Sequence, residues 1–300
     1  MSDAGGTSAF LEASVRTATP LLLAAIGEAV CERAGIINIG LEGCIIAGAF
    51  AAFVAGTSGI AVGYAAALLS GASVGVLLAI FVVLMRRDQI IVGTALTMLA
   101  LGVTGTLFRA RADVSMVVVT QSEVIVPGLS RIALIGPALF AQPAITYVAI
   151  ALVPLVTAWL YRTQAGLALR AVGESPAAAR AAGIRVSTVH WGAILFGASL
   201  GGVAGGALVL AQAGTFAEGM SAGRGFLAIA IVALGRWRPF GVLAASLVFG
   251  IAMAFQFAVQ SLGLQVRYEL VLMIPYVLTL VALGAVSRGG APAMLGRFEL

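Results

Sequence analysis

Residues 43–85 read GCIIAGAFAAFVAGTSGIAVGYAAALLSGASVGVLLAIFVVLM and contain no charged side chain in 43 positions. A transmembrane helix needs about 20 apolar residues, so this stretch is long enough for two spans, with the turn at residues 56–59. The whole chain has 300 residues, of which 61% are hydrophobic and 10% are charged. The sequence therefore predicts an all-α, polytopic membrane helix bundle that forms a single domain over residues 1–300.

Apolar stretches on both sides of this region bring the predicted number of spans to eight or nine, with the amino terminus outside. A first apolar helix is expected over residues 17–30, broken at Glu28. The apolar stretch 225–235 is only about 16 Å of helix at 1.5 Å per residue, so it is either a half-helix inside the bundle or a span completed by the corner at 236–238. The remaining elements are expected to be a tight turn at 86–88, an external loop with a short helix at 109–143, and spans at 89–108, 144–161, 186–211, 240–264 and 270–286.

Residues 162–185, RTQAGLALRAVGESPAAARAAGIR, form a polar interruption with four arginines against one glutamate. The positive-inside rule places this loop in the cytoplasm, together with the tail at 287–300. Ser175 followed by Pro176 predicts the start of a short helix that Gly183 ends. An earlier helical turn over 166–172 is expected, with Gly173 as the hinge that joins it to the short helix. Such a loop is either a strap on the membrane surface or a docking element for a soluble partner.

Three stretches of the chain resemble a known family. The pattern LALRAVGESPAAARAAGI at 167–184 resembles the cytoplasmic coupling loop of bacterial ABC importer permeases of the branched-chain amino acid, ribose and nucleoside group. Residues 19–43, TPLLLAAIGEAVCERAGIINIGLEG, are similar to the amino-terminal signature of the nucleoside and simple-sugar branch, in the shorter of its two permeases. The tail APAMLGRFEL resembles that of the same subunit. The resemblance to this family extends over nearly the whole chain.

The resemblance implies a permease of the bacterial inner membrane that moves a nucleoside or a simple sugar by alternating access. Its partners would be an ABC ATPase subunit that binds ATP, a second permease that forms a heterodimer with this chain, and an extracytoplasmic solute-binding protein. The chain itself would bind no cofactor. The residues assigned to ATPase coupling are Gly166, Arg170, Gly173, Glu174, Ser175, Pro176, Arg180 and Gly183.

The basic residues exclude several other functions. All 17 are arginines, and a phosphate-cradling loop of the Walker type needs a lysine, so the chain is not itself a P-loop ATPase. The arginines lie at span ends, where orientation and lipid headgroups explain them without a nucleic acid partner. Cys31, Cys44 and His190, the single histidine, cannot supply a four-ligand zinc site. No catalytic or metal site is expected, and an interfacial role is expected for His190.

A group of polar residues lies among apolar stretches near the start of the chain: Glu28, Glu32, Arg33, Asn38 and Glu42. Charges in such places face a bundle interior or a water-filled cavity. One interpretation is an ion-pair cluster in which Arg33 pairs with Glu28 or Glu32 and fixes a bent first helix. The other is a lining of the translocation path, and the glycines around INIGLE favour Asn38 and Glu42 for it, because they indicate an irregular backbone.

Later spans carry weaker signals. Thr97 and Gln256 are candidates for the translocation path, although hydroxyl and amide groups in membrane helices more often bond a neighbouring helix. Gly197, Gly201 and Gly205 recur every four residues and predict a flat stripe where another helix approaches closely. A secondary, ion-coupled transporter for a small polar solute is the alternative function, but such a carrier has no need of a capped docking loop.

The charge pattern predicts the orientation of two segments. Cysteines introduced at Ala178 and Ala293 should react only from the cytoplasmic side, because arginines dominate both segments. The measurement is labelling by a membrane-impermeant thiol reagent in intact and in opened cells. Labelling of either position in intact cells would reverse the orientation.

Overall fold

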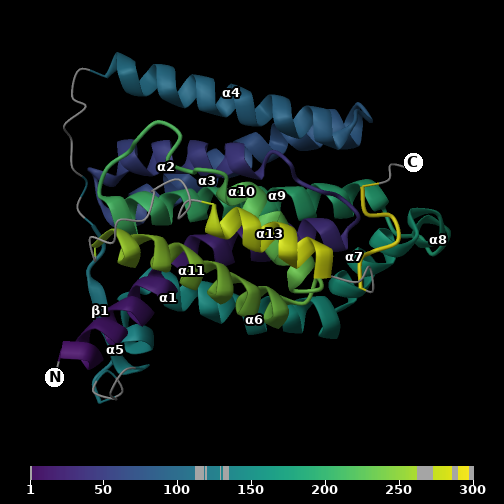
Figure 1. Cartoon of the computed structure of the whole chain (residues 1–300). Coiled ribbons are helices and arrows are strands. Elements are labelled where there is room, and N and C mark those ends of the chain that lie inside the picture. Colours follow the sequence, from purple (N-terminus) through teal and green to yellow (C-terminus); the bar gives the residue numbers. More distant parts are fainter. Residues whose placement is uncertain are drawn as a thin grey trace.

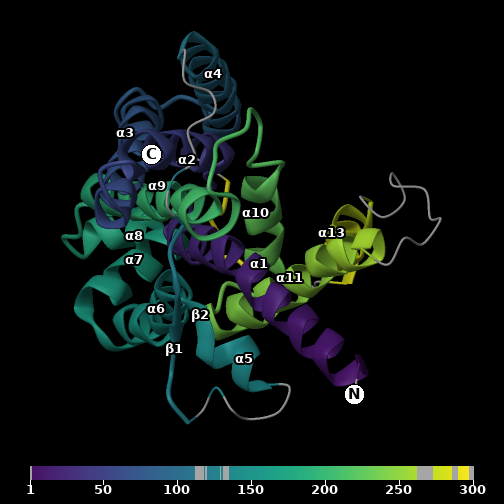
Figure 2. The same ribbon diagram turned by 90° about the vertical axis from the view of Figure 1, so that its left-hand side faces the viewer.

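Helix α1 (Ser2–Arg33) runs through the centre of the bundle in the computed structural model (Figures 1 and 2). It packs against α9 (Val186–Leu208), α11 (Pro239–Ser261) and the short α10 (Arg224–Leu234). Most of its apolar side chains are therefore buried within protein. The structure describes residues 2–111, 118, 120–128, 130, 135–261, 273–285 and 290–296.

Six helices in the described residues are long and apolar enough to cross a membrane. The all-α class is thus confirmed, whereas the predicted number of eight or nine spans is not. Beyond α1, α9 and α11, the set comprises α3 (Ile60–Ala79) with the π-helical turn η1 (Ile80–Leu84), α4 (Gln89–Ala110) and α6 (Ala144–Arg162). Shorter helices are α2 (Leu41–Gly56), α10 and α13 (Ile274–Ala285), and the π-helical turn η3 (Val209–Ala213) extends α9.

The predicted turns are present. α2 ends at Gly56 and α3 begins at Ile60. Asp88 caps α4, because its carboxylate accepts from the backbone N–H groups of Ile90 and Ile91 at 2.9 and 3.0 Å. The stretch 225–235 corresponds to the half-helix alternative, since α10 has 11 residues, ends before the corner at 236–238 and is shorter than the helices that could span a membrane.

The end of the bundle near the amino terminus is closed by a small cap. Its parts are the strand β1 (Glu123–Ile125), the predicted short helix, α5 (Ile135–Phe140), and the strand β2 (Ala141–Pro143), which pairs antiparallel with β1. Arg16 of α1 forms ion pairs with Glu12 at 2.7 Å and with Glu123 at 2.5 Å. The cap is therefore tied to the outer part of the central helix.

The prediction of a first helix that breaks at Glu28 is wrong. α1 continues through Glu28 to Arg33 without interruption. A carboxylate on a helix leaves the helical backbone bonds intact, so a buried acid does not end the helix when its side chain has a partner elsewhere. The partner here is the backbone N–H of Asn38, which donates to Glu28 Oε1 at 2.8 Å.

The glycine stripe of α9 lies where helices approach most closely. A Cβ atom added at Gly205 would overlap the carbonyl oxygen of Ile45 on α2, and one at Gly201 would lie 2.7 Å from Leu41 Cδ1. At Gly197 the added atom would overlap Cys31 Sγ of α1. α9 thus contacts α1 and α2 along the stripe, while Gly202 beside it contacts α3.

Replacing Gly205 by leucine should destabilise the bundle by about 2 kcal/mol or more, because overpacking a fitted core costs about 1–3 kcal/mol and here the obstacle is backbone. Gly102→Leu on α4 is the matched control, since Gly102 is exposed and an added Cβ there meets nothing within 4 Å. The measurement is membrane yield and the thermal unfolding midpoint of the purified protein. Equal midpoints for the two variants would show that the α2 contact tolerates bulk.

Candidate functional site

The segment between α1 and α2 is the first irregular part of the site. α1 ends at Arg33, Gly35 has a left-handed φ of 91°, and α2 begins at Leu41. Glu28 is fully buried and holds this segment through the Asn38 N–H. Asn38 is itself fully buried. The sequence pattern INIGLE therefore does mark a break in the helices, within the protein interior.

Glu32 joins the end of α1 to the corner between α10 and α11. Its Oε2 atom accepts a hydrogen bond from Nε1 of Trp237, and both residues are buried. Arg33 donates through Nε to the Trp237 carbonyl at 2.9 Å. The predicted ion pair of Arg33 with Glu28 or Glu32 is wrong, since no salt bridge among the described residues involves either acid. Glu28 instead bonds a backbone N–H group, and Glu32 bonds an indole N–H group.

Glu42 caps the half-helix α10. Its two carboxylate oxygens accept from the backbone N–H groups of Gly223 at 2.8 Å and Gly225 at 2.6 Å. A negative charge is favourable at a helix amino terminus, where N–H groups lack partners within the helix. Gly225 permits the approach, because an added Cβ would overlap the backbone N of Glu42. α10 is about 16 Å long, which is shorter than the hydrocarbon core of a bilayer, about 30 Å.

An irregular loop, residues 214–223, leads into α10 and has an open polar side. Arg224 donates through Nη1 to the carbonyl of Met220 at 2.7 Å, and Arg109 of α4 pairs with Glu218 at 2.7 Å. The hydroxyl of Tyr276, a half-exposed residue of α13, donates to the Ala222 carbonyl at 3.4 Å. We call Arg109, Glu218, Arg224 and Tyr276 the polar face. Figure 2 shows the loop and α10 between α4 and α13.

The structure brings some of the predicted path residues together. Asn38 lies on the segment between α1 and α2, Glu28 accepts from its N–H, and the Thr97 hydroxyl donates to the Ile39 carbonyl at 3.4 Å. Glu42 follows this segment in the first turn of α2. Gln256 is buried on α11, which packs mainly against α1, α10, α6 and α13. Their role in translocation stays a prediction.

Arg224 and Tyr276 were missed by sequence reasoning. The available signal was an arginine between two glycines at the start of an apolar stretch too short to span. His190 is buried, and its Nε2 lies 3.2 Å from the Ala34 carbonyl oxygen; its interfacial role stays a prediction.

The second part of the site is a pair of helices at the far end of the bundle from the amino terminus, α7 (Gln164–Glu174) and α8 (Pro176–Ala181) (Figure 1). The predicted cap is present: Ser175 Oγ accepts from the Ala178 N–H at 3.3 Å, with Pro176 at the first helical position. Gly183 has a left-handed φ of 81°. The chain turns at Ser175 rather than at Gly173, so the hinge prediction is wrong.

Gly173 instead joins α7 to the central helix. An added Cβ there would overlap the carbonyl oxygen of Arg33. Its own carbonyl accepts from the Met294 N–H at 3.1 Å, and Glu174 Oε2 accepts from Ala293 N–H at 3.3 Å, so the tail at 290–296 packs on α7. A helix that must touch both backbones needs glycine at this position.

The other end of α7 is fixed to α6. Arg170 donates through Nε to the Leu160 carbonyl at 3.1 Å, and its guanidinium lies 5.0 Å from the ring centroid of Tyr161. Gly166 packs so closely that an added Cβ would overlap the Trp159 carbonyl. α7 is therefore held at both ends by contacts with membrane-spanning helices.

α8 has one buried side and one free side. Pro176 and Ala179 are buried, and Ala179 packs with Val172 and Val186. The free side is small and carries one cation; its exposed residues are Ala177, Ala178, Arg180, Ala181, Ala182 and Gly183. We call these six residues the α8 face. A flat surface of this kind can fit into a cleft of another protein.

Removing the Glu42 carboxylate should destabilise the protein. Glu42→Ala leaves the buried Gly225 N–H and the partly buried Gly223 N–H unpaired, at a cost of about 1–3 kcal/mol for a buried group, whereas Glu42→Gln keeps one acceptor oxygen and should lose less. Glu174→Ala, which removes an exposed carboxylate that accepts a single N–H group, is the control. The thermal unfolding midpoint of the purified protein is the measurement. If all three variants unfold at the same temperature, the α10 terminus does not depend on this cap.

Comparison with known proteins gives the family. Residues 10–283 match the family described as branched-chain amino acid transport system / permease component. A guanosine ABC transporter permease of Bacillus subtilis is 33% identical over 304 residues, which cover 96% of this chain and 95% of that protein. A nucleoside ABC transporter permease of Lactococcus lactis is 34% identical over 280 residues, 88% of each chain.

A Haloferax volcanii protein provisionally named as a glucose ABC transporter permease is 35% identical over 258 residues, 85% of this chain and 78% of that protein. No solved structure matches the chain at a significant level. The family match covers most of the chain and agrees with several apolar helices long enough to span a membrane. The chain is therefore a multi-pass membrane protein that belongs to the permease-component family of the branched-chain amino acid transport system.

Proposed function

We propose that this chain is the permease subunit of an ATP-driven importer that moves a nucleoside across the bacterial inner membrane, with a simple sugar as the second candidate substrate. Relatives named for guanosine and nucleoside transport, aligned over most of their length, support the nucleoside. The observation that carries the proposal is the α7–α8 pair, which is held at both ends and presents a free surface. ATP would be bound by the partner ATPase subunit, and an extracytoplasmic binding protein would deliver the substrate.

The geometry of α8 supports a docking role over a surface strap. A helix that lies on a membrane turns an apolar side to the lipid, but the buried side of α8 packs on α7 and α9. Its exposed α8 face is composed of small side chains and Arg180. The contacts of Gly173 and Arg170 would pass a displacement of this pair to α1 and α6.

The polar face supports a second permease subunit. Irregular backbone and charged groups at membrane depth are tolerated only against protein or a water-filled path. The loop 214–223 and the polar face have an open side between α4 and α13. A sister permease on this side would enclose a path between the two subunits. The guanidinium of Arg224 and the hydroxyl of Tyr276 could then bond substrate hydroxyl groups.

An ion-coupled carrier remains the alternative, and purification separates the two. An importer permease should co-purify with an ATPase subunit and a second permease, whereas a carrier should come alone. The tail at 290–296 packs on α7, which supports a cytoplasmic location for both.

Changes in α8 should uncouple hydrolysis from transport without harming membrane insertion. Gly183→Val forces a β-branched residue toward a left-handed conformation it disfavours, and Ser175→Ala removes a cap worth on the order of 1 kcal/mol. Arg180→Glu reverses a charge on the α8 face and should weaken retention of the ATPase. All three should lower substrate-stimulated ATP hydrolysis in the purified complex, Gly183→Val most.

Gly128→Val is the matched control, because Gly128 also has a positive φ, 87°, and open space, but lies beside β1 in the cap near the amino terminus. It should insert, bind the ATPase and support hydrolysis as the wild type does. Undiminished uptake and hydrolysis in all three α8 variants would show that the α7–α8 pair only lies on the membrane surface. The ion-coupled carrier would then be the favoured function.

A further inference from the structure

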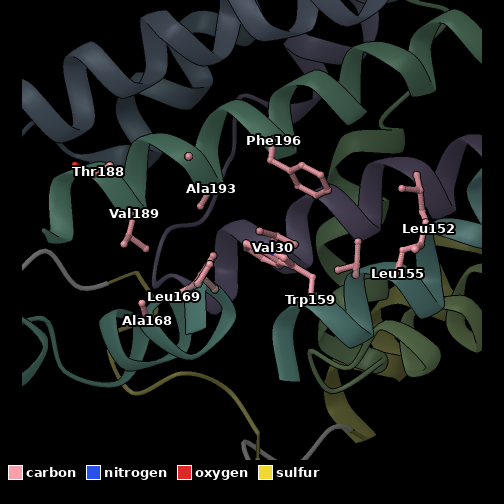
Figure 3. Close-up of a pocket in the computed structure, with 13 residues that line it drawn as sticks. Val30, Leu152, Leu155, Trp159, Ala168, Leu169, Thr188, Val189, Ala193 and Phe196 are labelled. Carbon is pink, nitrogen blue, oxygen red and sulfur yellow. The ribbon is translucent and has the colours of Figure 1, made fainter. Parts of the chain in front are cut away.

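A groove of about 530 Å³ opens between α6 and α9 (Figure 3). α1 forms its floor through Val30, and α7 closes one end through Leu169. The walls are one face of α6, with Leu152 and Trp159, and one face of α9, with Phe196. Its volume is in the range of small-molecule sites, about 300–1,000 Å³. The groove is almost wholly apolar and separate from the polar face.

Small residues keep the groove open. Gly192 and Ala193 on α9 and Ala165 and Ala168 on α7 occupy positions where larger side chains would fill the space. An added Cβ at Gly192 meets nothing within 4 Å. The groove therefore results from the small size of the residues that α7 and α9 place along it.

The rim of the groove is exposed and apolar. Leu155 is 63% exposed and Phe196 is 37% exposed. Both α6 and α9 are membrane spans, so this rim faces hydrocarbon. An apolar groove that opens into hydrocarbon takes up an acyl chain, because water finds few hydrogen-bond partners there.

Positive charge stands at one end of the groove. Trp159 and Thr188 are the last lining residues on α6 and α9. Arg162 comes three residues after Trp159, and Arg185 comes three residues before Thr188, so each arginine lies about one helical turn beyond the groove. Both arginines are exposed. Glu174 is the acid near these arginines in sequence, and its Oε2 atom accepts a hydrogen bond from the Ala293 N–H in the tail. An anionic headgroup would find two cations at headgroup depth, where Trp159 also favours the interface.

We propose that this groove binds an anionic glycerophospholipid, with one acyl chain between α6 and α9 and the phosphate beside Arg162 and Arg185. The site does not depend on the transported substrate. The bound chain contacts α1 and the coupling helix α7 together.

The test is native mass spectrometry of the detergent-extracted permease with its co-purifying partners, titrated with phosphatidylglycerol or phosphatidylcholine of the same acyl chains. Gly192→Leu projects a side chain into the groove and should weaken phosphatidylglycerol binding about tenfold, equivalent to about 1.4 kcal/mol. Gly102→Leu is the matched control, since an added Cβ at exposed Gly102 of α4 also meets nothing within 4 Å. Ala165→Leu fills the groove from α7 and should repeat the loss if Gly192→Leu folds poorly.

The headgroup is tested separately. Each arginine near a membrane surface contributes about 1 kcal/mol with anionic lipid, so Arg162→Gln with Arg185→Gln should lower the preference for phosphatidylglycerol over phosphatidylcholine about thirtyfold. Wild-type binding retained in Gly192→Leu and Ala165→Leu would overturn the groove as the site. Equal binding of the two lipids by the wild type would overturn the anionic headgroup. Cross-linking of Leu155→Cys to another subunit in membranes would show that protein, not lipid, covers the groove.

Discussion

Hydrocarbon offers no hydrogen-bond partners, and three breaks among the helices of this bundle each depend on a glutamate that supplies one. Glu28 accepts from Asn38 in the segment between α1 and α2. Glu32 accepts from Trp237 at the corner between α10 and α11. Glu42 accepts from Gly223 and Gly225 at the start of α10. A short stretch of chain around the first break thus stabilises all three, which explains carboxylates in an otherwise apolar region.

Local features could be predicted from the sequence, because the residues that cause them are adjacent. The cap at Ser175, the stop at Gly183 and the turn at 56–59 each follow from neighbouring side chains. Partners distant in sequence could not. Glu32 and Trp237 are 205 positions apart, and reasoning from proximity chose the neighbouring Arg33 as the partner instead. The same limit hid the relation between Glu42 and α10, although the irregular INIGLE pattern did direct attention to Asn38 and Glu42.

Helix α9 shows how glycine serves opposite purposes on one element. Along Gly197, Gly201 and Gly205 the missing side chain allows α1 and α2 to approach closely, so the contact is tight. At Gly192 the missing side chain leaves space beside α6. The sequence spacing predicts the first use, since the repeat is regular. The spacing does not predict the groove beside Gly192, because the groove also depends on which side chains of α6 and α7 face that glycine.

The packing of residues 290–296 on α7 has a consequence for biosynthesis. A chain leaves the ribosome from its amino terminus at about 5–20 residues per second, so α7 and α8 emerge long before the segment that bonds Gly173 and Glu174. Until Met294 is in place, the Gly173 carbonyl lacks its partner and α7 is held only from the α1 and α6 sides. The surface beside α8 is therefore completed only after α9, α10 and α11 have been synthesised, although α7 and α8 precede these helices in the chain.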